Sequence, residues 1–245
     1  MKPFGDNLAG YNALVVGGSG GIGSCASRAL AEAGANLVVH GGHRKDALEK
    51  VAAECRGHGV SCTTLLKELN DSAAVDALLD SGVPDILVVA FGPIRWVGVS
   101  DETPGGWRDM LLLNLAIPGA LVSACLPDMK KRGFGRLILF GASRGDVAPP
   151  SSEATAYTAA KSGLVSLARS VAKDGAAHNV SCNILCPGYV DTEYLDGRQR
   201  ALFTRRAPTG RLTDPENIGG FVTYLCGTAG RVINGAVINA GEGIV

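Results

Sequence analysis

A tyrosine and a lysine stand four residues apart, at Tyr157 and Lys161. Positions i and i+4 of a helix share a face, so the two side chains are expected to lie together. An ammonium group beside a phenol favours the phenolate and lowers a pKa that starts near ~10. Such a tyrosine can exchange a proton with an alcohol oxygen near neutral pH. Taken alone, however, the spacing is more typical of an exposed helix face.

A glycine-rich run upstream, Val15-Val16-Gly17-Gly18-Ser19-Gly20-Gly21-Ile22-Gly23, joins an apolar strand to a helix. Glycines let the backbone turn sharply and approach a pyrophosphate, whose charge the helix N-terminus favours. Two registers fit, G-x-G-x-x-G on Gly18, Gly20 and Gly23, or G-x-x-x-G-x-G on Gly17, Gly21 and Gly23. Because the run follows the first strand and opens a βαβ unit, it predicts a dinucleotide site that includes Ser19 and Ile22.

The end of the second strand indicates which nucleotide binds. An acidic residue there would bind the ribose 2′-hydroxyl of NAD. Val38-Val39 instead leads into His40-Gly41-Gly42-His43-Arg44-Lys45, and the first carboxylate is Asp46. Arg44 can receive a 2′-phosphate, so NADP(H) is favoured over NAD(H). The alternative interpretation is a solvated basic turn.

Composition excludes several classes of function. The 245 residues contain 23 Lys plus Arg and 23 Asp plus Glu, which argues against binding nucleic acid through a broad basic surface. Seven cysteines without a C-x-x-C pair, and four histidines, lack metal-site spacing, so we expect no metal and a reducing compartment. The N-terminus does not resemble a signal peptide, and no apolar run reaches ~18 residues. We therefore expect a cytoplasmic protein that does not enter a membrane.

Strand-like and helix-like segments alternate along the chain. Strands are predicted near 13–16, 36–39, 62–66, 85–90, 136–140, 180–185 and 236–238. Helices are predicted near 24–33, 45–55, 75–79, 107–131 (with a bend or an early interruption at Pro118), 157–173 and 218–225. Apolar strands separated by helices indicate a parallel sheet covered on both faces. The sequence thus predicts one α/β domain over residues 1–245, a doubly wound Rossmann fold.

The glycine turn, Asn114, Tyr157 and Lys161 occur in the order found in the short-chain dehydrogenase/reductase family, which the chain resembles over nearly its whole length. The resemblance extends to residues 85–88, 135–138, 187–192, 210–216 and 233–236. It implies the register Gly17, Gly21 and Gly23. It also implies cofactor contacts from Glu68 and Leu69 at the adenine, and from Ala90, Gly92, Tyr157, Lys161, Pro187, Gly188, Val190 and Thr192 near the nicotinamide.

The family mechanism implies a role for each matching polar residue. Tyr157 is the general acid in ketone reduction and the base in alcohol oxidation. Lys161 lowers the pKa of Tyr157 and holds the nicotinamide ribose, while Asn114 anchors a water in the proton relay. By itself, Asn114 in its apolar stretch could equally be a buried asparagine bonded to backbone.

Two departures from the family pattern matter. The family carries N-N-A-G after the strand at 85, where this chain has Val89-Ala90-Phe91-Gly92. The hydrogen-bonding groups at this strand end must therefore find other partners than the family's asparagines. The serine that orients the substrate carbonyl falls at Ala142 by one count and near Arg144 by another. We assign it to Ser143, which lies between them; the alternative is that this serine is lost.

The predicted function is hydride transfer between NADP(H) and a carbonyl or secondary alcohol. A substrate loop is expected around residues 189–212, and its excess of arginine could receive an anionic small molecule or acyl thioester, such as a 3-oxoacyl thioester. The alternative interpretation is a solvated basic face. The family resemblance implies a homo-oligomer, a tetramer or a dimer. The alternative function is a catalytically impaired relative that binds nucleotide as a sensor or assembly partner.

Overall fold

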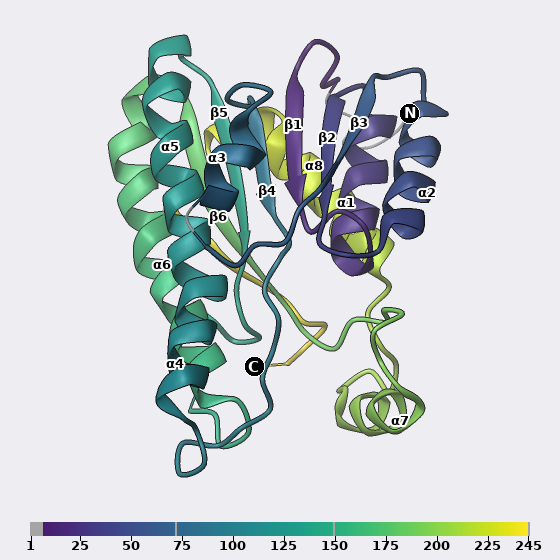
Figure 1. Cartoon of the computed structure of the whole chain (residues 1–245), viewed down its shortest axis with the longest axis vertical. Coiled ribbons are helices and arrows are strands. Elements are labelled where there is room, and N and C mark those ends of the chain that lie inside the picture. The colour runs from purple at the N-terminus through teal and green to yellow at the C-terminus, as the bar shows by residue number, and fades with distance from the viewer. Residues whose placement is uncertain (1–6, 72, 149, 245) are drawn as a thin grey trace.

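The computed structural model describes residues 7–71, 73–148 and 150–244. Its strands form one parallel sheet in the order β3-β2-β1-β4-β5-β6-β7 (Figure 1). The strands are β1 (Asn12–Val16), β2 (Asn36–Gly41), β3 (Cys62–Leu66), β4 (Ile86–Val89), β5 (Gly135–Phe140), β6 (Val180–Pro187) and β7 (Val237–Ala240). The doubly wound Rossmann fold is therefore confirmed.

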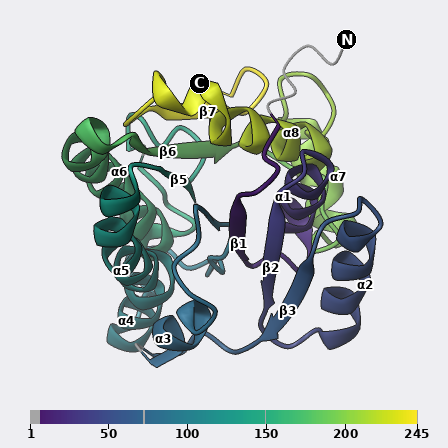
Figure 2. The same ribbon diagram turned by 90° about the horizontal axis from the view of Figure 1, so that it is seen from above.

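Helices cover both faces of the sheet (Figure 2). They are α1 (Gly21–Glu32), α2 (Lys45–Arg56), α3 (Ala73–Leu79), α4 (Pro104–Leu111), α5 (Ile117–Arg132), α6 (Thr155–Gly175), α7 (Gly197–Arg206) and α8 (Pro215–Cys226). Residues of α1, α2 and α8 pack in one hydrophobic cluster and residues of α3, α5 and α6 in the other. Continuous apolar strands such as β4, buried throughout, are what a sheet covered on both faces requires.

The predicted helix near 107–131 is longer than expected and is interrupted before Pro118. A π-helical segment, η1 (Leu112–Ala116), connects α4 to α5, and the Ile117 N–H donates to the Leu112 carbonyl. Pro118 has no N–H with which to reach the Asn114 carbonyl, so the regular i→i−4 ladder cannot continue there. The irregularity thus lies in the turn that carries Asn114.

This helix also corrects an expectation about apolar runs. Pro104–Arg132, taken as one helix, contains an 18-residue window with a mean hydropathy of 1.9, and it is the one helix among the described residues long and apolar enough to cross a membrane. One face of this helix packs in the protein core, where Leu121, Cys125 and Met129 are fully buried. Length and composition alone do not distinguish such a core helix from a membrane span.

A buried histidine fixes the glycine turn to the neighbouring strands. His40, at 1 % exposure, lies near the end of β2. Its Nδ1 accepts from the Gly17 N–H at 3.2 Å, and its Nε2 lies 2.7 Å from the Lys67 carbonyl oxygen. Burial lowers its pKa, partly offset by the bond to Lys67. The neutral ring therefore donates to Lys67 and accepts from Gly17, which joins the turn after β1 to the segment after β3.

His40 should make stability depend on pH. Its folded pKa lies below the ordinary 6.5, so the folded chain binds fewer protons, and the free energy of unfolding should fall as pH drops below 6.5. In His40→Leu this component should disappear. At pH 7.5 the variant should be less stable by about 1–3 kcal/mol, because two buried backbone groups lose their partner.

Urea unfolding of wild type and variant between pH 5 and 8 (about the range where histidine titrates) measures both effects. His58→Gln, at an exposed histidine, is the control and should behave like wild type. An unchanged pH slope in His40→Leu would contradict the role given to His40.

Candidate active site

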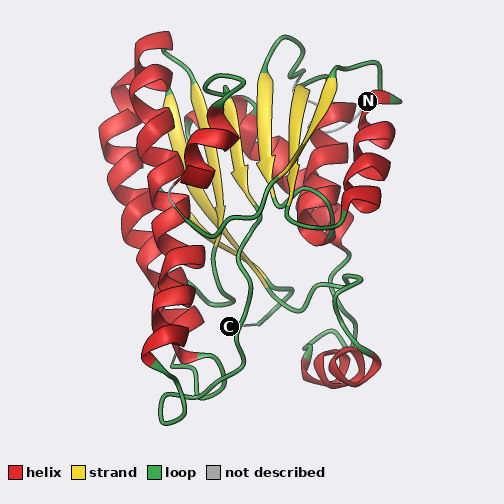
Figure 3. Cartoon of the chain, viewed as in Figure 1, coloured by secondary structure: helices red, strands yellow, loops and turns green. Residues whose placement is uncertain are grey.

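The strands of the sheet point toward one edge, where the connecting loops and α7 gather (Figure 3). The strand order reverses between β1 and β4 at this edge. In open α/β sheets, ligands bind beyond the carboxyl ends of the strands at such a switch point. The sheet topology therefore places the predicted site residues that follow β1, β4, β5 and β6 close to one another.

The backbone of the glycine turn fits the register Gly17, Gly21 and Gly23. Gly17 and Gly21 have positive φ angles of 81° and 52°, which side chains disfavour. A Cβ on Gly23 would overlap the Gly17 carbonyl oxygen, and one on Gly17 would lie 3.0 Å from the backbone of Ala90. Glycine is thus needed here for φ at two positions and for close packing at the third.

Lys161, a buried residue of α6, places its side chain against the end of β5. Its side chain, on a residue 4 % exposed, donates from Nζ to the Phe140 carbonyl at 2.9 Å. Burial lowers its pKa to about 8, opposed in part by Cys186. A cation this deep keeps little solvation, so it favours the nearest negative charge or carbonyl oxygen.

Asn114 supplies a buried amide beside Lys161. It is fully buried, its Nδ2 donates to the Pro93 carbonyl at 3.1 Å, and its Oδ1 has no partner among the described residues. A Cβ on Gly92 would overlap that Oδ1 and lie 2.6 Å from Lys161 Nζ. Gly92, with φ of 152°, therefore leaves a small polar space between the amide and the ammonium.

These contacts explain how the end of β4 is satisfied without the family's asparagines. The Ala90 N–H donates to the Val16 carbonyl at 2.9 Å, continuing the ladder between β4 and β1. Beyond it, the Asn114 side chain holds the Pro93 carbonyl. Backbone pairing and Asn114 together fix this segment, so Val89 and Ala90 need no polar side chain.

Tyr157 lies in the first turn of α6 and shares a face with Lys161. The Lys161 Nζ is 5.7 Å from the centroid of the Tyr157 ring, so the two side chains are together as predicted. The expected lowering of the phenol's pKa is wrong for the chain by itself, because burial raises the pKa of Tyr157 to about 12, with Cys186 acting in the same direction. Desolvation is the larger cause, and the Lys161 ammonium donates to the Phe140 carbonyl.

Ser143 follows β5 in a turn that begins three residues after Phe140. It is half-buried, and its neighbour Arg144 has a positive φ of 58°. Gly145 packs against Cys186, where an added Cβ would lie 2.6 Å from the sulfur. The turn is thus held at the same sheet edge as Lys161, and the catalytic role of Ser143 stays a prediction.

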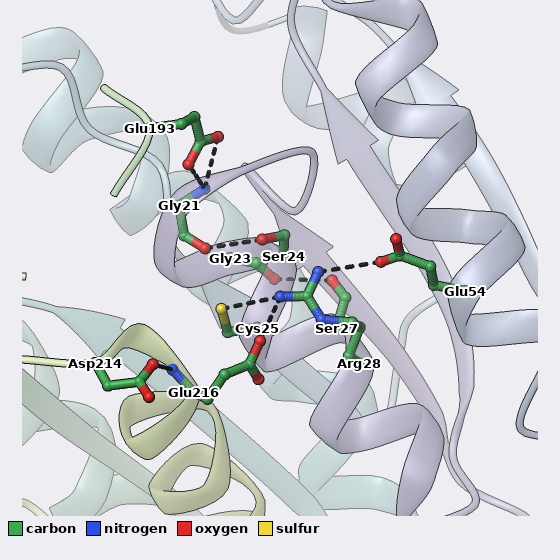
Figure 4. A network of polar contacts seen from close by, with 10 residues as sticks. All are labelled: Gly21, Gly23, Ser24, Cys25, Ser27, Arg28, Glu54, Glu193, Asp214 and Glu216. Atoms are coloured by element: carbon green, nitrogen blue, oxygen red, sulfur yellow. Dashed lines mark hydrogen bonds and ion pairs between the residues drawn. The ribbon is translucent and has the colours of Figure 1, made fainter. Parts of the chain in front are cut away.

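The first turn of α1 binds a carboxylate from a distant part of the chain (Figure 4). The Gly21 N–H lies 3.1 Å from both oxygens of Glu193. Arg44 also reaches this carboxylate, at 3.1 Å, and donates to the Tyr194 hydroxyl. The turn is therefore an anion site, and Arg44 is beside it rather than free in solvent.

The other predicted cofactor residues occupy several surroundings. Glu68 is exposed and pairs with His43 at 2.7 Å, while Leu69 is 6 % exposed in the core. Ser19 lies against Gly41, at the end of β2. Six further predicted residues lie along the same edge: Ile22 in α1, Ala90 after β4, Pro187 at the end of β6, and Gly188, Val190 and Thr192 after it.

The expected substrate loop contains α7 and an aromatic cluster. Phe203 of α7 stacks on Tyr189 at 4.8 Å between ring centroids and lies 6.2 Å from Trp96. Arg206 reaches Glu153, next to the start of α6, at 3.5 Å. The loop therefore connects the segment after β4, the segment after β6 and the helix that carries Tyr157.

Sequence reasoning missed three residues of this site. His40 was interpreted only as part of a basic turn, although a histidine closing an apolar strand is a signal for a buried link. Glu193 and Tyr194 were assigned to the substrate loop. Their contact with the glycine turn joins residues far apart in sequence, so no local spacing could predict it.

Comparisons with known proteins agree over almost the whole chain. Residues 17–244 match the family described as enoyl-(acyl carrier protein) reductase. D-beta-hydroxybutyrate dehydrogenase of Cupriavidus necator is 30 % identical over 97 % of this chain and 99 % of its own length. Oxidoreductase UcpA of Salmonella typhimurium is 32 % identical over 96 % and 95 %.

Solved structures give the same result. The 3-oxoacyl (acyl-carrier-protein) reductase of Agrobacterium tumefaciens, crystallised with NADP bound, has a TM-score of 0.89 at 30 % identity, covering 97 % of this chain and 95 % of that one. An angucycline C-6 ketoreductase with bound NADP has a TM-score of 0.90 at 27 % identity, covering 98 % and 97 %.

The burial of Lys161 should reduce stability. Its pKa falls from 10.5 to about 8, so Lys161→Met should raise the free energy of unfolding at pH 7 by about 2 kcal/mol, after loss of the bond to Phe140. The stability advantage of Lys161→Met over wild type should shrink as pH rises from about 8 to 10.5, because Lys161 of the folded wild-type chain is then deprotonated and no longer buries a charge.

Urea unfolding across this pH range measures the difference. Lys173→Met, at an exposed lysine of the same helix, is the matched control and should change stability little. A Lys161→Met protein that is less stable than wild type at every pH would show that the ammonium is not a cost to folding.

Proposed function

Because the chain belongs to the short-chain dehydrogenase/reductase family, we propose that it is an NADP-preferring oxidoreductase acting on a carbonyl or secondary alcohol. The observation that carries the proposal is the convergence of Asn114, Tyr157 and Lys161 at the sheet edge that also bears an anion-binding glycine turn. NAD(P)-dependent hydride transfer is the activity that needs these two features side by side.

The residues present fit a nicotinamide dinucleotide. The Gly21 N–H already binds an anion, the Glu193 carboxylate, where a pyrophosphate would bind. The unpartnered Oδ1 of Asn114 and the buried ammonium of Lys161 offer an acceptor and a donor next to Gly92. Gly17, Gly18, Gly21 and Gly23 would hold the dinucleotide through backbone, and Pro187, Gly188, Val190 and Thr192 would hold its nicotinamide end.

In the proposed mechanism, the bound cofactor supplies the hydride or accepts it. Tyr157 donates its phenolic proton to the carbonyl oxygen in reduction and removes it in oxidation. A protonated Lys161 keeps a positive charge close to the phenolate, whose formation burial otherwise opposes. Asn114 orients a water that returns the proton, and Ser143 donates a hydrogen bond to the substrate oxygen.

Arg44 supports the preference for NADP(H). A Cβ on Gly20 would overlap the guanidinium of Arg44, so the glycine makes room for a cation at the edge of the turn. A guanidinium here can pair with a 2′-phosphate, which NAD(H) lacks. NADP is present in the solved structures of two similar proteins.

The aromatic cluster supports a substrate with an apolar part. Tyr189 and Phe203 of the substrate loop form an aromatic cluster with Trp96, which lies in the segment after β4. Of the loop arginines, Arg200, Arg206 and Arg211 pair with carboxylates, so the excess of positive charge is smaller than the sequence implied. A 3-oxoacyl thioester, whose acyl chain is apolar, remains the proposed subclass.

We also propose a cytoplasmic homo-oligomer, a tetramer or a dimer. The helical surfaces of α4, α5 and α6 would provide the contact between copies. Leu111, a large apolar residue 38 % exposed at the end of α4, is the kind of side chain such a contact would bury. Sedimentation velocity of the purified chain would distinguish a monomer from either assembly.

Tyr157→Phe removes only the hydroxyl that moves the proton. Turnover of NADPH with ketone or 3-oxoacyl thioester substrates should fall by about 10³-fold or more, while NADPH affinity stays within about threefold. Absorbance at 340 nm and NADPH fluorescence measure the two quantities. Tyr11→Phe, at the opposite end of the sheet, is the control and should keep full turnover. Substantial turnover by Tyr157→Phe would refute the proton role.

Arg44→Ala should separate the two cofactors. We expect the Kd of NADPH to rise about 10- to 100-fold, because a charge-assisted pair with the 2′-phosphate is lost, whereas the Kd of NADH should not rise. Lys45→Ala removes a neighbouring exposed cation and should affect both cofactors slightly. Equal weakening of both cofactors in Arg44→Ala would refute the phosphate role.

A further inference from the structure

The segment from Asp191 to Asp196 folds across the first turn of α1. The Glu193 carboxylate accepts from the Gly21 N–H with both oxygens, each at 3.1 Å. Within the described residues of α1, no side chain of its own first turn is acidic, and its N-cap, Gly20, has no side chain to offer. Glu193 therefore supplies, from 172 residues away, the negative partner that this helix end lacks.

Two further side chains fasten this contact. Arg44 pairs with Glu193 at 3.1 Å, donates to the Tyr194 hydroxyl, and places its guanidinium carbon 4.7 Å from the centroid of the Tyr194 ring. A Cβ on Gly20 would overlap all three of these side chains. The three side chains thus pack into the space left by one glycine.

The electrostatics favour the ionised carboxylate. Although burial alone would raise the pKa of Glu193, its hydrogen bonds to backbone N–H groups, including that of Gly21, and to Arg44 hold the pKa below its usual range. The helix N-terminus and Arg44 are also the groups proposed to bind the pyrophosphate and 2′-phosphate of the cofactor. The single N–H of Gly21 cannot serve the Glu193 carboxylate and a pyrophosphate oxygen in the same place.

We propose that Glu193 is an internal competitor of the cofactor, held by Arg44 and Tyr194, and that the dinucleotide binds only after this segment leaves the turn. The inference rests on the proposed function. We call the contact of Glu193, Arg44 and Tyr194 with the glycine turn the carboxylate latch. Cofactor affinity is then reduced by the fraction of molecules in which the latch is closed.

The latch also connects the cofactor site to the substrate loop. Arg200 of α7 pairs with Asp191 and donates to the Thr192 carbonyl at 3.2 Å. Thr192, next to Glu193, is one of the residues proposed to contact the nicotinamide. Opening of the latch therefore moves a segment that α7 holds from its other side, so binding of the cofactor and the position of the loop are coupled.

Two substitutions separate the latch from simple charge repulsion. Glu193→Gln removes the charge, whereas Glu193→Asp keeps the charge but shortens the side chain so that it no longer reaches Gly21. Glu216→Gln is the matched control, because it removes a carboxylate from the same 490 Å³ cavity beside α1 without touching the turn. The Kd of NADPH and of NADH is measured for each by fluorescence titration and calorimetry.

We expect Glu193→Gln and Glu193→Asp to bind both cofactors about tenfold more tightly, because the pyrophosphate is common to both. Glu216→Gln should bind like wild type. Without cofactor, both Glu193 variants should unfold at lower urea concentration. With saturating NADPH this difference should vanish, because the latch is then open in every protein.

Several results would overturn the latch. If Glu193→Asp binds like wild type while Glu193→Gln binds more tightly, the effect is charge repulsion alone. If neither variant gains affinity while wild type binds NADPH, the latch fails and the proposed function stands. If wild type and variants all lack affinity for both cofactors, the proposed function is wrong, and the latch, which rests on it, is wrong too.

Discussion

The first turn of α1 presents backbone N–H groups that need a negative partner, and much of the structure serves this requirement. Gly17 and Gly21 give the turn its positive φ angles, and Gly23 lets the helix start against the Gly17 carbonyl. His40 holds the turn between β1 and β2 through the Gly17 N–H. Because the turn cannot cap itself, some anion must approach it, and Glu193 shows where that anion binds.

The second group of polar residues follows from desolvation. Burial disfavours the charged form of both Tyr157 and Lys161, raising the pKa of one to about 12 and lowering that of the other to about 8. The pair therefore does not produce a phenolate on its own. A substrate oxygen that takes the proton, and a protonated Lys161 beside the phenolate, are what would make the transfer favourable, so the chemistry depends on complete assembly of the site.

The sequence predicted the fold well because the signals are local. Apolar runs such as residues 86–89 and helical segments such as residues 155–175 can be recognised from their own residues. The glycine run marks the turn between the first strand and the first helix. The spacing of Tyr157 and Lys161 likewise predicted their shared face. At Pro118 the sequence predicted a bend or an early interruption but not a π-helical segment, since the missing N–H of proline determines where the helix is disturbed and not which hydrogen bonds replace the regular ones.

Features that depend on residues distant in sequence were not predicted. The direction of the Tyr157 pKa shift required knowing how deeply the folded chain buries its phenol. The contact of Glu193 with Gly21 required the path of the chain after β6. For residues 111–126, the sequence alone did not distinguish a contact between copies from a helix packed on the sheet; Leu121 and Cys125 of α5 lie in the core.

A crystal structure of the chain in complex with NADPH tests the anion site most directly. We expect a pyrophosphate oxygen within hydrogen-bond distance of the Gly21 N–H, the Glu193 carboxylate out of reach of that group, and the Tyr157 hydroxyl facing the nicotinamide ring. NADPH bound elsewhere while Glu193 stays on Gly21, or a Tyr157 ring turned away from the nicotinamide, would contradict the site described here.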